Sequence, residues 1–135
     1  MMTEFTSDPA ILAACVLHDT VEDCADVTLE VIHERFGELV AGYVFFVTEK
    51  SQKSDGNRKV RKEIDNEHYS RGSSVSQDIK ICDLIHNVPS MVLYDPEFAK
   101  VYIEEKLNLL MVLSRAEPAL KRRAYNLLYK LRRMV

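Results

Sequence analysis

The chain has 135 residues, of which 47% are hydrophobic and 29% are charged, so it is long enough to bury one sizeable core. This composition excludes a disordered chain, and no stretch reaches the ~18 apolar residues that a membrane-spanning helix needs. The net charge is -3, but residues 115–135 carry seven basic residues and one acid. Such a segment can mark an anionic partner, although a solvated helix face is the commoner explanation. We expect one domain over residues 1–135, without membrane or nucleic-acid partners.

The first half of the chain is rich in helix signals. Asp8 followed by Pro9 is typical of a helix start, and the apolar run that continues to Leu17 has no polar face. We therefore predict a first helix that is central to the core. Thr28 can cap a second helix, which Gly37 can close. The apolar residues 39–47 fit a helix or a strand, and we predict a helix from their neighbours.

The second half continues the helical pattern. Residues 49–57 are polar and predict an exposed loop, and residues 58–69 predict a charged helix. Ser73 or Ser74 can cap a helix that ends near Val88, because Pro89 follows. Two more helices, opened by prolines, are expected over about 95–133, the first of them ending near residue 116. The sequence thus predicts an all-α fold.

Three cysteines, Cys15, Cys24 and Cys82, lie in or beside apolar stretches and include no C-x-x-C pair. They predict buried, reduced thiols in a cytoplasmic protein. The N-terminal residues have neither a basic region nor a long apolar run, so we expect no signal peptide.

Four ionisable residues crowd the end of the first predicted helix: His18, Asp19, Glu22 and Asp23. Helical spacing puts His18 and Glu22 on one face and Asp19 and Asp23 on another. Imidazole and carboxylate groups suit a divalent metal such as manganese, iron or zinc. The remaining acids could position water or move protons. The alternative is a charged helix end without a metal.

A second candidate group contains Asp83 and Asn87, which lie four positions apart among apolar neighbours. A carboxylate in such surroundings needs a partner. That partner could be a metal, or the ammonium group of Lys80 or Lys62.

Together these segments match a known pattern. The motifs are H-D-x-x-E-D from His18, T-L-E-x-I-x-x-R-F-G from Thr28, V-T-E from Val47 and D-I-K-x-x-D-L-x-H-N from Asp78. They resemble the HD-domain superfamily of metal-dependent phosphohydrolases, and within it the hydrolase domain of the RelA/SpoT-type enzymes and their small stand-alone relatives. The resemblance covers about residues 9–90 and implies an HD-type helical bundle.

The resemblance also implies roles for individual residues. His18, Asp19 and Asp83 would bind one divalent metal, usually manganese. Glu22 and Asp23 would be the catalytic pair that activates water.

The implied substrate is a guanosine polyphosphate. The resemblance assigns Asn87 to the nucleotide and places Lys80, Arg58 and Arg61 near its phosphates. The implied reaction removes the 3′-pyrophosphate from ppGpp or pppGpp, and the metal would offset charge on the phosphoryl oxygens. Two alternatives remain open at this point: the hydrolysis of another nucleotide phosphoester, and a non-catalytic module that binds a nucleotide or a protein.

One ligand of the family is missing. The family has a further histidine on an upstream helix, whereas no histidine precedes His18. Loss of a ligand could lower metal affinity by orders of magnitude, because even outer-shell losses cost 10–100-fold. The next histidine, His33, is expected at the surface. We also expect a homo-oligomer, in which a second copy covers apolar residues of the first helix, namely Ile11, Leu12, Cys15 and Val16.

Overall fold

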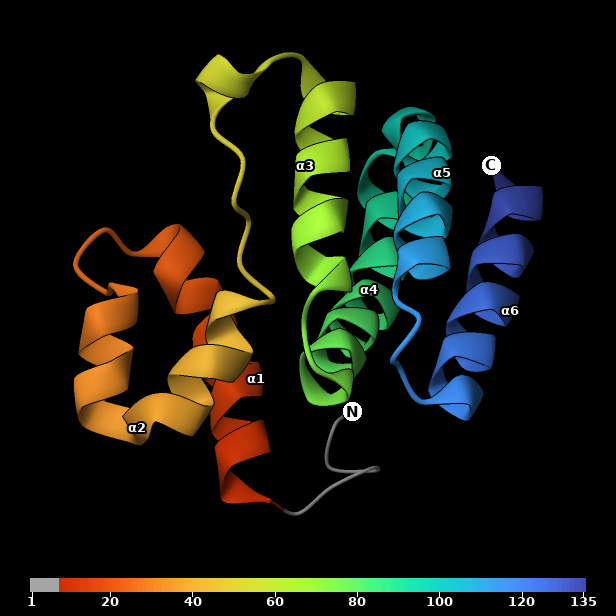
Figure 1. The fold of residues 1–135 in the computed structure, drawn as a ribbon. Coiled ribbons are helices and arrows are strands. Elements are labelled where there is room, and N and C mark those ends of the chain that lie inside the picture. Colours follow the sequence, from red (N-terminus) through yellow and green to blue (C-terminus); the bar gives the residue numbers. More distant parts are fainter. Residues whose placement is uncertain (1–7) are drawn as a thin grey trace.

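The computed structural model describes residues 8–135, which form six α-helices and one short 3-10 helix, with no strand among them (Figure 1). They are α1 (Pro9–Asp23), α2 (Leu29–Phe45), η2 (Lys53–Asp55), α3 (Arg58–Ser70), α4 (Ser74–Tyr94), α5 (Pro96–Val112) and α6 (Pro118–Met134). The all-α prediction is confirmed, and the arrangement is consistent with an HD-type helical bundle. No helix within residues 8–135 is long and apolar enough to cross a membrane. The signal-peptide expectation concerns residues outside this described range.

Each α-helix begins at a side chain that accepts a hydrogen bond from the first turn. These N-caps are Asp8, Thr28, Asn57, Ser73, Asp95 and Glu117. Such caps satisfy backbone N–H groups that have no partner within the helix. The predicted caps Asp8 and Thr28 are therefore confirmed, and Ser73 rather than Ser74 opens α4.

The α2 helix is interrupted at Gly37, where φ is 92° and ψ is 172°. Residues with a Cβ atom rarely adopt this conformation, so glycine is suited to the break. The residues after it return to a helix that ends at Phe45. The predicted stop at Gly37 and the predicted second helical segment are both confirmed.

Two predicted helix ends are wrong. The α4 helix runs through Pro89 to Tyr94 instead of ending at Val88. An internal proline costs about 3 kcal/mol, but Val88 is fully buried and Val92 is partly buried, so the packing on both sides of Pro89 offsets much of that cost. The α5 helix ends at Val112, because the next residue, Leu113, turns away and is buried in the connection to α6.

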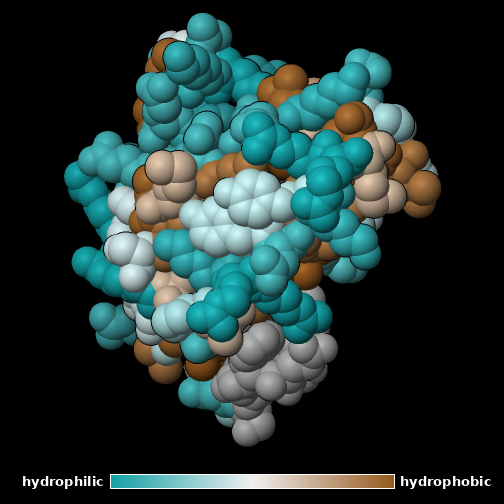
Figure 2. All heavy atoms as spheres, turned by 90° about the vertical axis from the view of Figure 1, so that its right-hand side faces the viewer, coloured by the Kyte–Doolittle hydropathy of each residue, from teal (hydrophilic) through white to brown (hydrophobic). Residues whose placement is uncertain are grey.

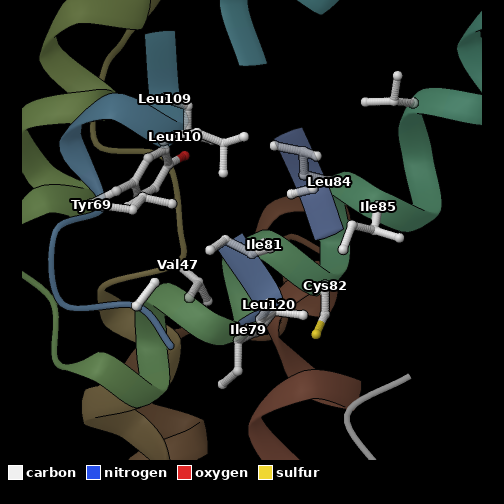
Figure 3. Packing of buried hydrophobic residues seen from close by; sticks show 14 of the residues in the cluster. Val47, Tyr69, Ile79, Ile81, Cys82, Leu84, Ile85, Leu109, Leu110 and Leu120 are labelled. Atoms are coloured by element: carbon white, nitrogen blue, oxygen red, sulfur yellow. The ribbon is translucent and has the colours of Figure 1, made fainter. Parts of the chain in front are cut away.

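The α4 helix is the centre of the bundle. It packs against α5 and α6 on one side and also contacts α2 and α3, while α1 and α2 pack against each other (Figure 1). Figure 3 shows the core around α4, where its apolar side chains meet those of α5 and α6. The residues in this part of the core are Ile79, Ile81, Leu84, Leu109, Leu110 and Leu120.

The prediction that the first helix is central to the core is wrong. Among the side chains of α1 that the structure describes, only those of Ala14 and His18 are buried, and Val16 is 75% exposed. The reason is that α1 packs mainly against α2 at the edge of the bundle, so one of its apolar faces stays outside.

The cysteine prediction also needs correction. Cys82 is buried and Cys15 is partly buried, but Cys24 is exposed because it lies just beyond the end of α1.

The basic α6 helix has the predicted amphipathic character. Its buried side chains form one stripe, whereas most of its basic side chains are exposed. The face that carries α6 is largely hydrophilic, with small apolar patches between (Figure 2). Arg132 pairs with Glu104 of α5 at 2.8 Å. A solvated helix face is therefore sufficient to explain this basic segment.

Candidate metal and phosphate site

The imidazole ring of His18 is held in a defined orientation at the last turns of α1. Its Nδ1 lies 2.7 Å from the carbonyl oxygen of Cys15, one turn earlier. A carbonyl oxygen only accepts hydrogen bonds, so Nδ1 carries the proton and donates it. In the neutral ring, Nε2 then keeps its lone pair. This hydrogen bond to a backbone carbonyl is typical of histidines that ligate metals.

The Nε2 atom of His18 faces two carboxylates from different helices. It lies 3.1 Å from Oδ1 of Asp19 in α1 and 3.3 Å from Oδ1 of Asp83 in α4. One ligand atom from each of the three residues lies within 4.8 Å of the others. Asp19 and Asp83, which the resemblance assigns to one metal, therefore lie close together although they are 64 positions apart in the sequence.

The pKa values of His18 and Asp83 are shifted in opposite directions from their ordinary values. Burial alone would lower the pKa of His18, but the hydrogen bond with Asp83 and the negative charges of Asp83 and Asp19 raise it. Burial alone would raise the pKa of Asp83, but His18 and the positive charges of Lys80 and Lys106 lower it. Three ligand atoms around one point therefore require a proton or a cation between them. One nitrogen and two carboxylate oxygens form a donor set that fits a divalent transition metal.

Asn87 supports Asp83 from the next turn of α4. Its Nδ2 donates to Oδ1 of Asp83 at 3.0 Å. The same oxygen also faces His18, so two groups orient this carboxylate. In this structure Asn87 contacts the candidate ligand Asp83, whereas the resemblance assigns Asn87 to the nucleotide.

Lys80 is 8% exposed and lies in the interior, one turn before Asp83. Its Nζ atom lies 4.3 Å from the centre of the Tyr69 ring and 3.5 Å from the carbonyl oxygen of Val47. Its positive charge helps to lower the pKa of Asp83. The buried ammonium group of Lys80 thus acts on the candidate site through its charge.

The two predicted phosphate-binding arginines of α3 are in different situations. Arg58 makes a two-pronged ion pair with Glu105 of α5, with N–O distances of 2.7 and 2.9 Å, and lies over the Phe98 ring. Arg61 is partly buried, and its Nε atom is the one buried side-chain nitrogen or oxygen within residues 8–135 that has no hydrogen-bond partner. Arg58 is therefore already neutralised, whereas Arg61 keeps an unused donor.

The predicted catalytic pair lies in the last turn of α1. Asp23 is the final residue of the helix and is exposed. Glu22 lies one turn after His18, but its side chain is outside the described part of the structure. His33 is exposed on α2, as predicted, and lines a separate groove with acidic neighbours.

Sequence reasoning missed two residues of α5 near this cluster. Burial and the positive charges of Lys80 and Lys62 lower the pKa of Lys106 to about 8. Burial and the negative charges of Asp83 and Glu105 raise the pKa of Tyr102. The two residues lie four positions apart, but the α5 segment carries no recognisable motif. Their proximity to Asp83 comes from the packing of α5 on α4.

Comparisons with known proteins find relatives that share one functional name. No family model matches the chain, and no solved structure matches it significantly. The chain is 33% identical over 91 residues to guanosine-3′,5′-bis(diphosphate) 3′-pyrophosphohydrolase MESH1 of Xenopus tropicalis. The matched region covers 67% of this chain and 49% of the relative. It is 32% identical over 91 residues to MESH1 of Danio rerio, covering 67% of this chain and 48% of the relative.

A bacterial relative carries the same functional name. The guanosine-3′,5′-bis(diphosphate) 3′-pyrophosphohydrolase of Aquifex aeolicus is 30% identical over 119 residues, 80% of this chain and 15% of the relative. The chain spans about half the length of the two MESH1 proteins. It is therefore similar, over most of its own length, to proteins that are named guanosine-3′,5′-bis(diphosphate) 3′-pyrophosphohydrolases.

Proposed function

We propose that this protein is an HD-type, metal-dependent phosphohydrolase that removes the 3′-pyrophosphate from guanosine 3′,5′-bis(diphosphate). The observation that carries the proposal is the convergence of His18, Asp19 and Asp83 from two helices onto one point. The three relatives named for this activity support the choice of substrate.

The metal ligands in this proposal are the Nε2 atom of His18 and one carboxylate oxygen each from Asp19 and Asp83. The bond between Nδ1 of His18 and the Cys15 carbonyl orients the ring for this task, and Asn87 orients Asp83. A divalent metal, for which we propose manganese, would offset charge on the phosphoryl oxygens and make water a better nucleophile at neutral pH.

The proton transfers are assigned to the acids at the end of α1. Water attacks the phosphorus attached to the 3′-oxygen, and the bond between that phosphorus and the 3′-oxygen breaks. Glu22, supported by Asp23, takes a proton from the attacking water and passes it to the 3′-oxygen, which leaves as a hydroxyl. The products are guanosine 5′-diphosphate and pyrophosphate.

The substrate-binding residues in this proposal lie on α3 and α4. Asn87 reaches the nucleotide, and the buried Lys80 adds positive charge near Asp83. The unpaired Nε donor of Arg61 is buried and meets a phosphate oxygen only after the side chain moves, whereas Arg58 binds a phosphate only after it releases Glu105.

The test combines metal binding with turnover. We expect the purified chain to bind manganese and to release pyrophosphate from guanosine 3′,5′-bis(diphosphate) in manganese buffer. The Asp83→Asn variant should lose manganese affinity by at least tenfold, because an amide supplies no negative charge. Asp26→Asn, in the exposed turn after α1, makes the same chemical change away from the cluster and should leave both properties unchanged.

Three results would contradict the proposal. Absence of manganese binding would remove the metal site. Binding without turnover of any guanosine polyphosphate would favour a non-catalytic nucleotide-binding role. Faster turnover of another nucleotide phosphoester would mean that this other nucleotide, and not guanosine 3′,5′-bis(diphosphate), is the substrate.

A further inference from the structure

The outer face of α2 is hollowed, and the apolar side chains in it are left uncovered. Two hollows of about 590 and 570 Å³ lie along this helix, and both are lined by Glu38 and Gly42. Because they share these residues, the two hollows adjoin each other. We call them together the α2 groove, whose apolar lining includes Leu29, Phe45 and Phe46.

We propose that the α2 groove binds the basic face of α6 from a second copy of this chain. The basic face consists of Arg122, Lys130 and Arg133 around the ring of Tyr129. This contact between two copies is independent of the proposed metal site and of the proposed activity.

The carboxylates of the α2 groove lack cations to balance them. Glu30, Glu34 and Glu38 are exposed, and none of them forms a hydrogen bond or an ion pair within residues 8–135. Among the described residues that line the groove there is no lysine or arginine. Like charges four positions apart on a helix, such as Glu30 and Glu34, repel each other. A basic partner therefore removes a repulsion that the single chain retains.

The apolar lining of the groove also lacks a partner. Leu39 is 57% exposed and Phe45 is 44% exposed. The α2 helix packs mainly against α1, so it projects from the edge of the bundle (Figure 1). Uncovered large apolar side chains beside a hollow are typical of contact surfaces. The partner therefore needs an apolar or aromatic group among its cations.

The α6 helix carries a surface with both properties. Arg122, Lys130 and Arg133 are exposed and form no hydrogen bond or ion pair with the rest of the described chain. Tyr129 lies among them, 45% exposed and stacked on Tyr125 with ring centres 6.1 Å apart. Positions 122, 129 and 133 share one helix face, because seven and four residues correspond to whole turns. Three unpaired cations around an aromatic pair thus match three unpaired carboxylates around an apolar hollow.

The two surfaces do not meet within one molecule. The α2 and α6 helices lie on opposite sides of the bundle, with α3, α4 and α5 between them (Figure 1). A second copy supplies the complementary charge instead. Around a two-fold axis, each copy gives its α6 to the groove of the other, so the contact forms twice. The exposed apolar face of α1 is a separate surface.

A solvated α6 face makes a different prediction. Exposed cations that contact only water leave self-association unchanged when their charges are reversed. Charge reversal on α2 and α6 therefore separates a docking surface from a solvated one. Restoration by the combined reversal shows in addition that the two surfaces face each other.

The experiment is sedimentation of the full chain at low ionic strength, over about 1–100 µM, a range suited to weak contacts. We expect the groove variant, Glu34→Lys with Glu38→Lys, to lower the association constant about tenfold or more, because two attractions become repulsions. The matched control is Glu63→Lys with Glu97→Lys, which changes the net charge equally at exposed positions of α3 and α5. This control should associate like the wild-type chain.

The complementary variant reverses two cations of α6. Arg122→Glu with Arg133→Glu should also lower the association constant about tenfold or more. Its matched control is Lys53→Glu with Lys59→Glu, at exposed positions outside both surfaces.

The decisive measurement combines the two charge reversals. A chain that carries the groove reversal and the α6 reversal together should return to within about threefold of the wild-type constant, because opposite charges face each other again. An equimolar mixture of the two separate variants should associate more strongly than either variant alone. High salt should weaken the wild-type association, since exposed charges are screened.

Three results overturn the proposal. They are a wild-type chain that stays monomeric over the whole range, a reversal that acts no more strongly than its control, and a combined chain that does not regain association. The last result would mean that another segment or another protein occupies the groove. Thermal melting checks that every variant is folded. Should the combined chain fail to fold, the mixture of the two separate variants carries the test.

Discussion

Hydrogen bonds to neighbouring groups set the orientation and protonation of single side chains at the candidate site. The carbonyl of Cys15 sets the tautomer of His18, and Asn87 orients the carboxylate of Asp83. Glu105 holds Arg58 through both of its carboxylate oxygens. The chemistry available at the site therefore depends on which hydrogen bonds are already made, and not only on which residue types are present.

Glu22 is the residue whose replacement tests the proposed proton transfer. Glutamine has nearly the same size as glutamate but does not accept a proton at neutral pH. We expect Glu22→Gln to fold and bind manganese like the wild-type chain, while pyrophosphate release falls by at least 10²-fold. Manganese titration and a pyrophosphate assay measure the two properties. Turnover at the wild-type rate would mean that another group activates the water.

The lowered pKa of Lys106 predicts unusual chemical reactivity. With a pKa of about 8, against an ordinary lysine value near ~10.4, a large fraction of its amine is neutral at pH 8. We expect an acylating reagent at pH 8 to modify Lys106 faster than the exposed Lys100, and the difference to shrink as the pH approaches 10. Mass spectrometry of digested protein measures both rates. Equal rates at pH 8 would show that the amine is not activated.

Local sequence signals determine where the helices begin and end, but tertiary packing can override them. Caps and prolines determine where the helices begin, since they act within one turn. The α4 helix nevertheless continues through Pro89, because Val88 and Val92 flank it with buried or partly buried side chains. In α2, by contrast, the break at Gly37 follows the sequence signal.

The two glycines of α2 offer a matched test of this break. Gly37 has a φ of 92°, so Gly37→Ala should lower the free energy of unfolding by about 1–3 kcal/mol through backbone strain alone, since a Cβ atom there meets nothing within 4 Å. Gly42 lies in the helical part and is also open, so Gly42→Ala should raise the free energy of unfolding by about 0.5–1 kcal/mol. Chemical denaturation measures both changes. A tolerated alanine at Gly37 would mean that the break is not required.

At the scale of the molecule, α4 links the α1–α2 pair to α5 and α6. It contacts α5 and α6 through the main core and also contacts α2, whereas α1 reaches the site from the edge (Figure 1). The candidate site lies at this junction, with His18 and Asp19 from α1 and Asp83 from α4. Relative movement of α1 would therefore separate His18 from Asp83.

The exposed face of α1 leads us to expect a homo-oligomer. Val16 is 75% exposed, and Ile11, Leu12 and Cys15 near it are only partly buried. Burial of such a surface contributes about 25 cal/mol per Å². We expect sedimentation to show a dimer or larger species, and Val16→Lys to shift it toward the 15.5 kDa monomer. Val101→Lys, at an exposed valine of α5, should not. A wild-type monomer at micromolar concentration would contradict this expectation.

The sequence by itself determined the features that depend on near neighbours in the chain. The caps at Asp8 and Thr28, the stop at Gly37 and the all-helical composition follow from interactions within a few residues, and the motifs around His18 and Asp83 are equally local. The close approach of His18 and Asp83 could be anticipated only through a resemblance, because the two residues lie 65 positions apart.

Only the tertiary structure decided the charge environment of these residues. The packing of α5 against α3 and α4 neutralised Arg58, brought Lys106 near Asp83, and placed α1 at the edge of the bundle instead of its centre. Electrostatic interactions and burial depend on which helices meet in space, and a local sequence pattern carries no record of that.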